Sequence, residues 1–200
     1  MSNEAATSFL DALASKSPTP GGGAASAYAG AMAAALTVMV ARTTLGKKAY
    51  AGVEARMRAI IDEAEAHRAA LTDAVMLDGA AYEALLAARR TGDTQVVERA
   101  VHHAAEVPLQ TAETALRVLA LAIETAETGN RNATSDACAA ANLAHSAASA
   151  SLLNVKVNSS EMEDRTEADR LATRANELLE RADALWVRLP ALAQERLGVD

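Results

Sequence analysis

An uncharged segment rich in alanine, Ala24 to Ala41, constrains the fold of this chain more than any other feature. Eight of its first twelve residues are alanine. It is almost long enough to span a bilayer, but so much alanine makes it only mildly hydrophobic, which favours a buried central helix of a soluble bundle. The residues before it are Ser17-Pro18-Thr19-Pro20-Gly21-Gly22-Gly23.

This loop of prolines and glycines gives the helix a defined start. The prolines stiffen the approach, and the glycines allow a tight turn or a close approach of the backbone to a ligand. A helix that begins here points free N–H groups and the positive end of its dipole at the loop, where an anionic or electron-rich ligand group would be favoured. The alternative is that the glycines only form the turn into a buried helix.

The rest of the chain also has the apolar spacing of helices, with intervals of three and four residues, and lacks the alternation of strands. We therefore predict an all-α, up-and-down bundle of about six long helices in one domain covering residues 1–200. Pro108 predicts a kink or a break near Val107 in the fourth helix. Thr134 or Ser135 can cap the fifth helix. Helices are expected over residues 3–15, 23–44, 52–90, 94–128, 134–158 and 164–188.

Composition excludes several classes of protein. The net charge of −7 and the absence of a basic run argue against a partner nucleic acid. Cys138, the one cysteine, cannot form an intrachain disulfide and suits a reducing cytoplasm, and no signal peptide is apparent. No set of metal ligands is evident, since the neighbours His102 and His103 project in different directions.

Alanine-rich faces favour close helix pairing, and we expect a homodimer that binds no membrane.

The third predicted helix has a carboxylate within its apolar face. A charge there is unfavourable unless it is paired or hydrogen-bonded, and burial would raise its pKa towards the range used in proton transfer. Asp78 is therefore a candidate general base, and the alternative is an Asp that caps or bridges a neighbouring helix. The face comprises Met57, Ile60, Ala64, His67, Leu71, Ala74, Asp78, Ala81, Leu85 and Ala88.

Two lysines follow Gly46 at the end of the second predicted helix. Lys47 and Lys48 could simply complement the negative end of the helix dipole. In a globally acidic protein they could instead hold an acidic ligand, or one of them could pair with Asp78 and tune its pKa.

Two polar pairs lie in the fifth predicted helix. Asn154 and Asn158 are four residues apart and share one face, where their amides could bind a flat polar ring or satisfy backbone near the helix end. Ser135 and Asp136 open the same helix, and capping alone would explain them.

A series of short motifs spans nearly the whole chain in a fixed order. They are Pro18-Thr19-Pro20-Gly21-Gly22-Gly23, Thr44-Leu45-Gly46-Lys47-Lys48-Ala49-Tyr50, Asp78-Gly79-Ala80-Ala81-Tyr82, Val107-Pro108-Leu109, Gly129-Asn130, Ser135-Asp136-Ala137 and Asn154-Val155-Lys156-Val157-Asn158. This series resembles the cyclodeaminase/cyclohydrolase family of tetrahydrofolate enzymes. That family includes the cyclodeaminase half of formiminotransferase-cyclodeaminase and the separate methenyltetrahydrofolate cyclohydrolases.

The resemblance implies an enzyme of folate one-carbon metabolism that needs no cofactor of its own and acts on a tetrahydrofolate derivative. The preferred reaction is hydrolysis of 5,10-methenyltetrahydrofolate to 10-formyltetrahydrofolate, with Asp78 as general base and Asp136 as second choice. The alternatives are cyclodeamination of 5-formiminotetrahydrofolate, and a non-catalytic, regulatory dimer that binds folate. The residues expected to bind substrate are Thr19, Pro20, Gly21, Gly22, Gly23, Lys47, Lys48, Tyr50, Ser135, Asp136, Asn154 and Asn158.

These residues lead to two expectations about geometry. The glycines 21–23, Asp78 and the face of Asn154 and Asn158 should line one cleft, within one subunit or at a subunit boundary. Asp78 should be largely buried, with a basic or hydrogen-bonding neighbour, of which Lys47 or Lys48 is favoured.

Overall fold

The computed structural model describes residues 4–198, and side chains from residue 7 onwards. Within this range all regular structure is helical, which confirms the predicted all-α class. The elements are α1 (Glu4–Leu13), α2 (Gly22–Thr44), the 3-10 segment η1 (Lys48–Val53), α3 (Glu54–Thr91), α4 (Thr94–Thr128), the 3-10 segment η2 (Arg131–Ala133), α5 (Thr134–Ser160), α6 (Arg165–Trp186) and α7 (Leu189–Leu197).

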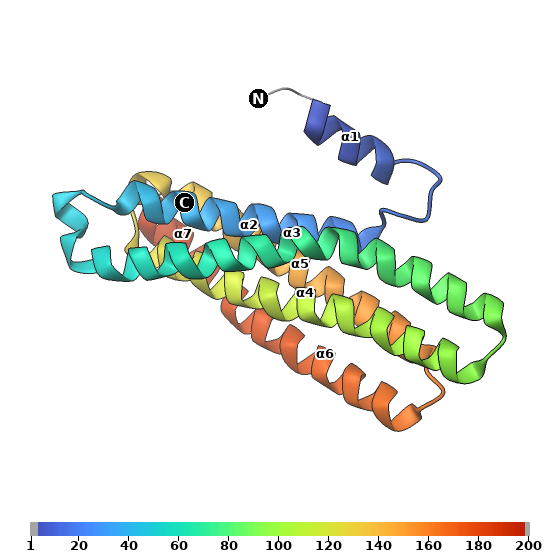
Figure 1. Ribbon diagram of the computed structural model, residues 1–200. Coiled ribbons are helices and arrows are strands. Elements are labelled where there is room, and N and C mark those ends of the chain that lie inside the picture. Colours follow the sequence, from blue (N-terminus) through green and yellow to red (C-terminus); the bar gives the residue numbers. More distant parts are fainter. Residues whose placement is uncertain (1–3, 199–200) are drawn as a thin grey trace.

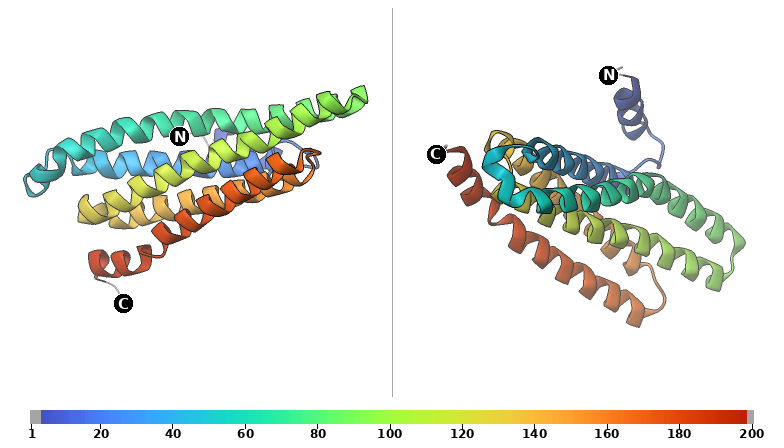
Figure 2. Two further views of the ribbon diagram at one scale, coloured as in Figure 1. Left: turned by 90° about the horizontal axis from the view of Figure 1, so that it is seen from below. Right: turned by 60° about the vertical axis from the view of Figure 1, so that its left-hand side comes forward.

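Four long helices form the body of the molecule. Each of α2, α3, α4 and α5 packs on the next in the chain, and α5 returns to pack on α2, so the four close into an antiparallel bundle (Figure 1). Helix α6 lies against α4 and α5, as the view from below also shows (Figure 2). Helix α7 packs on α4 and α5 at the end of the bundle where α2 finishes.

The alanines of α2 allow these helices to lie close together. A Cβ placed on Gly30 would already lie 3.2 Å from the methyl groups of Leu71 on α3. By length and composition α2 could cross a membrane, but 61% of its most apolar window is buried inside the bundle, as in the core helix of a globular protein. The buried alanines of α2 are Ala24, Ala27, Ala31, Ala33, Ala34 and Ala41.

Of the kink or break expected near Val107, a break does not occur, because helix α4 continues through Pro108. Proline has no N–H to donate to the carbonyl four residues earlier. That carbonyl, of Ala104, instead accepts a hydrogen bond from Nδ2 of Asn158 on α5, at 2.6 Å. A side chain of a neighbouring helix therefore replaces the missing backbone bond.

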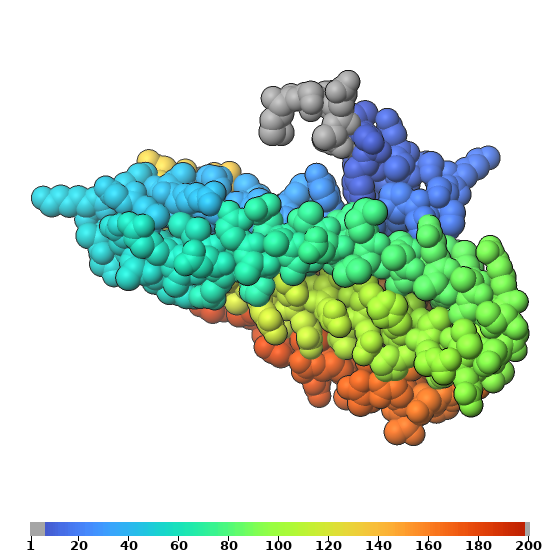
Figure 3. All heavy atoms as spheres, in the orientation of Figure 1, coloured from blue at the N-terminus to red at the C-terminus, as the bar shows by residue number. Residues whose placement is uncertain are grey.

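Helix α1 stands apart from the bundle above α2 (Figures 1 and 3). The ring of Phe9 packs on the ring of Tyr28 in α2, with 4.9 Å between their centroids. The segment that joins α1 to α2 contains a cis peptide bond between Thr19 and Pro20.

Candidate functional site

A cleft of about 180 Å³ lies where the start of α2 faces α3, α4 and α5. The structure brings together here the glycines 21–23, Asp78 and the asparagine pair on α5, which are far apart in the sequence. The residues that line the cleft are Pro18, Thr19, Gly21, Gly22, Gly23, Asp78, Ala81, Tyr82, Leu85, Ala104, Asn154 and Asn158.

The carboxylate of Asp78 caps α2 from a different helix. Its Oδ2 accepts a hydrogen bond from the backbone N–H of Ala24, at 3.0 Å, in the first turn of α2. Gly21, at the N-cap position, has no side chain that could do this. The positive end of a helix dipole favours an anion. The helix start that was expected to face a ligand anion is thus already occupied by the protein's own carboxylate.

Gly23 is the glycine of the loop that this contact requires. A Cβ at Gly23 would lie 1.9 Å from Oδ1 of Asp78, whereas a Cβ at Gly22 would meet nothing within 4 Å. None of the three has a positive φ angle, so unusual backbone conformation is not the reason for them. The absence of a side chain at Gly23 lets the carboxylate approach the helix end.

Two effects act in opposite directions on the pKa of Asp78. Burial raises the pKa of the carboxyl group above its ordinary value, and the hydrogen bond from Ala24 opposes part of that rise. The side chain is only partly buried, less than expected, because one side opens onto the cleft. The result is a carboxylate that accepts a proton more readily than one in water.

The two amide side chains across the cleft differ in whether they already have hydrogen-bond partners. Asn158 donates from Nδ2 to the carbonyl of Ala104, which leaves its Oδ1 as an acceptor. The side chain of Asn154 makes no hydrogen bond with any residue that the structure describes, so its amide is free for a ligand.

Sequence reasoning missed several residues of the lining. The most prominent of them is Tyr82. Its spacing could have predicted it, because Tyr82 lies four residues after Asp78 and both project from the same face of α3. Leu85 and Ala104 belong to apolar helix faces, and nothing in their spacing distinguishes them from core residues.

Lys47, Lys48 and Tyr50 lie at the opposite end of α2. That helix has 23 residues and is therefore about 35 Å long. Both lysines are exposed, and the hydroxyl of Tyr50 accepts a hydrogen bond from the backbone N–H of Arg131, at 3.0 Å. The expectation that a lysine adjoins Asp78 is wrong within one chain, because an α-helix keeps its two ends apart.

The pair Ser135 and Asp136 is also remote from the cleft. Helix α5 runs antiparallel to α2, so its first turn lies beside the end of α2 and its last turns beside the glycines. The expected cap by Thr134 or Ser135 is wrong: no side chain caps this helix, and the hydroxyl of Thr134 is buried without a partner. The 3-10 segment η2 leads directly into α5 and takes the place of a capping turn.

A larger apolar groove, of about 510 Å³, adjoins the cleft between α1 and α3. Thr19 lines both hollows, while Pro20 lines only the groove. The groove contains neither Asp78 nor the asparagines, and its one carboxylate, Glu83, is exposed to solvent, so we take the smaller hollow as the candidate active site. Its lining is Ser8, Phe9, Ala12, Thr19, Pro20, Val75, Met76, Gly79, Ala80 and Glu83.

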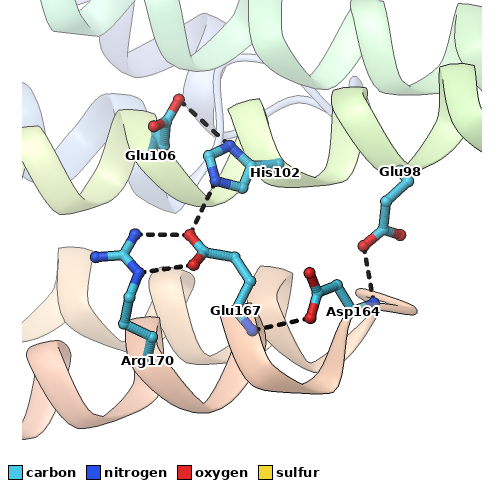
Figure 4. Close-up of polar contacts among 6 residues, drawn as sticks. All are labelled: Glu98, His102, Glu106, Asp164, Glu167 and Arg170. Carbon is cyan, nitrogen blue, oxygen red and sulfur yellow. Dashed lines mark hydrogen bonds and ion pairs between the residues drawn. The ribbon is translucent and has the colours of Figure 1, made fainter.

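A second cluster of titratable side chains joins α4 to α6 (Figure 4). Nε2 of His102 lies 3.0 Å from Oε1 of Glu167, and its Nδ1 lies 3.5 Å from Glu106. Arg170 donates two hydrogen bonds to Glu167, and these, followed by that of His102, lower the pKa of Glu167 to about 2. A carboxylate held so firmly as an anion is a poor proton acceptor, so this cluster ties helices together.

Comparison with known proteins gives consistent matches over most of the chain. The formiminotransferase-cyclodeaminase family model matches residues 5–177. A methenyltetrahydrofolate cyclohydrolase of Methylorubrum extorquens is 37% identical over 196 residues, which cover 94% of each chain. The formimidoyltransferase-cyclodeaminase of Rattus norvegicus is 30% identical over 87% of this chain, but only 34% of that protein is covered. The crystal structure of formiminotetrahydrofolate cyclodeaminase from Thermotoga maritima has a TM-score of 0.91, 31% identity and 96% coverage of both chains.

Proposed function

This chain belongs to the formiminotransferase-cyclodeaminase family, and we propose that it hydrolyses 5,10-methenyltetrahydrofolate to 10-formyltetrahydrofolate. The relative from Methylorubrum extorquens, which is named for this hydrolysis, matches the chain over nearly its full length. The observation that carries the proposal is the position of Asp78, whose carboxylate is held by the N–H of Ala24 and faces a cleft of polar and apolar groups.

The chemistry suits such a carboxylate. The carbon that bridges N5 and N10 of the substrate is part of a cationic amidinium, and a nearby anion stabilises it. Asp78 takes a proton from a water molecule as the water oxygen bonds to that carbon. The tetrahedral adduct then breaks its bond to N5, N5 receives the proton from Asp78, and the hydroxyl of the adduct loses its proton to solvent to become the formyl oxygen.

Neighbouring groups fit a pterin beside Asp78. The free amide of Asn154 and Oδ1 of Asn158 can bind the polar edge of the ring system, and Tyr82 and Leu85 offer apolar contact. Ligand pockets usually measure about 300–1,000 Å³, so the cleft of about 180 Å³ holds only part of the substrate. We assign the reacting end to the cleft and the rest of the molecule to the space beyond it, which includes the adjoining groove.

Cyclodeamination of 5-formiminotetrahydrofolate is the second candidate. It is favoured by the match to the solved cyclodeaminase of Thermotoga maritima over 96% of both chains. In that reaction an acid must protonate the departing ammonia. The raised pKa of Asp78, caused mainly by burial, would help its protonated form to serve as that acid.

We further propose that the protein acts in the cytoplasm as a homodimer, with no metal or cofactor of its own. The alternative of a silent folate-binding protein predicts binding without turnover. The bundle itself would suit either role, so the activity of Asp78 is what distinguishes them.

The decisive experiment follows the absorbance of the methenyl group after purified protein is added to 5,10-methenyltetrahydrofolate. We expect rapid loss of the chromophore, formation of 10-formyltetrahydrofolate, and a turnover roughly 100- to 10,000-fold lower with the Asp78→Asn variant. With 5-formiminotetrahydrofolate as substrate, ammonia release and a rising methenyl absorbance would instead support the deaminase. Tight binding of either compound without turnover would identify the silent protein.

A further inference from the structure

A further hollow, of about 200 Å³, lies between α4 and α6, and we call it the α4–α6 pocket. Its lining includes Arg117 of α4 and both Arg174 and Arg181 of α6. On α4, Ala104 lines the cleft described above and Leu116 lines the α4–α6 pocket. These two residues are 12 positions apart, so the two hollows are about 18 Å apart along the helix. The pocket is therefore separate from the candidate active site.

Two of the three arginines in this pocket have no partner of opposite charge. Arg174 forms ion pairs with Glu113, at 2.9 Å, and with Glu177, at 3.5 Å. Arg117 and Arg181 form no ion pair and no hydrogen bond with any residue that the structure describes, and both are exposed. The lining holds three guanidinium groups but only one carboxylate, that of Glu113. The pocket is thus positively charged in a chain whose net charge is −7.

Free guanidinium groups are uncommon in this chain. Among the described arginines, only Arg90 and Arg99 likewise have neither an ion pair nor a hydrogen bond, and they flank the turn between α3 and α4. Burial, and then the positive charge of Arg117, lower the pKa of His67 on α3, which agrees with a guanidinium that no carboxylate neutralises. Two free guanidinium groups from different helices therefore meet at the α4–α6 pocket.

The floor of the α4–α6 pocket is apolar. Leu116 and Leu178 are buried and Leu185 is half-buried, so they offer contact area and no hydrogen bonds. A guanidinium group binds a carboxylate through two parallel hydrogen bonds and also stacks on aromatic rings. An inorganic anion would leave the leucines without contact, and a neutral ring would leave the arginines without a partner. The combination fits a ligand that has both an aromatic ring and a carboxylate.

We propose that the α4–α6 pocket is a second binding site, for a small aromatic carboxylate. Arg117 and Arg181 bind the carboxylate, and the leucines of the floor contact the ring. A ligand held in this way joins α4 to α6, so its binding should also raise the thermal stability of the folded protein. The inference does not depend on the proposed function, because no residue of the cleft takes part.

The site is tested first with naphthalene-2-carboxylate as the probe, by nuclear magnetic resonance of the full chain labelled with 15N. The Nε–Hε signals of Arg117 and Arg181 are identified from single Arg→Lys variants. Both signals should shift saturably with the probe, while those of Arg90 and Arg99 should stay in place. Binding that moves neither pocket arginine, for example in the apolar groove between α1 and α3, overturns the proposal.

A pair of double variants tests the arginines themselves. Arg117→Met/Arg181→Met keeps much of the length of both side chains but removes their charges, and the affinity for naphthalene-2-carboxylate should fall at least about tenfold by calorimetry. Arg90→Met/Arg99→Met is the matched control, because it removes two exposed, unpaired guanidinium groups elsewhere, and it should keep the wild-type affinity. The rise in thermal stability should disappear only in the pocket variant. Equal affinities of the two double variants would contradict the assignment.

Two further probes test the class of ligand. Naphthalene-2-carboxamide keeps the ring without the charge, and acetate keeps the charge without the ring. Each should bind at least about tenfold more weakly than naphthalene-2-carboxylate. Equal binding of the amide would show that the arginines do not select the ligand, and equal binding of acetate would show that the apolar floor does not, so either result overturns the proposed class.

The outcomes are independent of the catalytic proposal. The Asp78→Asn variant should bind naphthalene-2-carboxylate as tightly as the wild-type protein does, whatever its turnover. Loss of that binding would place the probe in the cleft and overturn the second site. Arg117→Met/Arg181→Met should retain wild-type turnover of 5,10-methenyltetrahydrofolate in the absence of the probe, because both residues lie outside the cleft lining.

Discussion

The two ends of α2 are built in opposite ways. At its end, the hydroxyl of Thr44 is buried, donates to the carbonyl of Val40 at 2.8 Å and accepts the N–H of Asn130 at 2.9 Å. At its start, the N–H of Ala24 is bound by a carboxylate that faces a cleft and whose pKa is raised by burial. One end therefore closes the bundle with satisfied neutral hydrogen bonds, and the other holds an ionisable group ready to change its protonation.

This difference separates stability from activity along a single helix. A neutral hydrogen bond between buried groups stabilises the fold by about 0.5–1.5 kcal/mol. A partly desolvated carboxylate weakens the fold slightly but gains basicity, which is what a general base needs. Substitutions at the two ends should therefore affect different measurements.

The largest effect is expected at Asp78. Asp78→Asn removes the base but keeps the size of the side chain, and turnover should fall roughly 100- to 10,000-fold. The dependence of kcat/KM on pH should lose a limb whose pKa lies above that of an ordinary carboxyl group, because burial raises it. Thermal stability should hold or rise. A well-folded variant with nearly normal turnover would move the search for the base elsewhere.

Substitution of the glycine beside this carboxylate should act through it. Gly23→Ala places a Cβ where Oδ1 of Asp78 now lies, so the carboxylate must rotate and lose the Ala24 hydrogen bond. We expect turnover to fall at least about tenfold and the free energy of unfolding to fall by about 1–3 kcal/mol.

Gly22→Ala is the matched control for folding. That position has open space around it, and alanine in place of a helical glycine stabilises by roughly 0.5–1 kcal/mol. Chemical denaturation of both variants measures the difference. Equal stability of the two alanine variants would show that the close approach at Gly23 is unimportant.

At the other end of α2, Thr44→Val should change stability and leave chemistry alone. Valine keeps the shape but leaves the buried N–H of Asn130 without an acceptor, which costs about 1–3 kcal/mol. The hydroxyl of its neighbour Thr43, an exposed residue, donates to the carbonyl of Val40 and accepts no hydrogen bond from any residue that the structure describes, so Thr43→Val should cost much less. Urea unfolding of both variants, with turnover per folded molecule, tests this; a large fall in turnover with unchanged stability would contradict it.

A smaller effect is expected where α5 meets α4. Asn158→Ala leaves the carbonyl of Ala104 without a donor, and stability should fall by about 1–2 kcal/mol. In a Pro108→Ala background the new backbone N–H can supply that bond, so the same substitution should matter less. A double-mutant cycle measures this coupling, and additive effects would show that the two bonds are independent.

The smallest effect is the contribution of Asp78 to the pH dependence of stability. Its pKa is higher in the folded state, so its favourable contribution is present below the unfolded value of about 3.9 and is lost as pH rises through the folded value. As pH rises from about 3.9 through the pKa of Asp78 in the folded protein, the wild-type protein should therefore lose stability relative to the Asp78→Asn variant. If the difference in the free energy of unfolding between the two proteins is constant with pH, burial does not shift the pKa of Asp78.

Helix periodicity predicted most of the fold because it depends on local spacing. Apart from His67 and Asp78, every residue of the apolar face predicted for α3 is buried. The uninterrupted course of α4 could not be predicted, because the carbonyl that Pro108 leaves free is satisfied by Asn158, a residue 54 positions from Ala104.

By itself, the sequence determined the helical class, the family and the choice of Asp78 as the carboxylate of interest, since these follow from residue type and spacing. Only the tertiary structure decided which polar groups meet. It placed Asp78 against Ala24 and beside the asparagines of α5, and it separated both from Lys47 by the length of α2. The physical reason is that helix spacing fixes which face a residue occupies, whereas antiparallel packing fixes which ends of helices lie together.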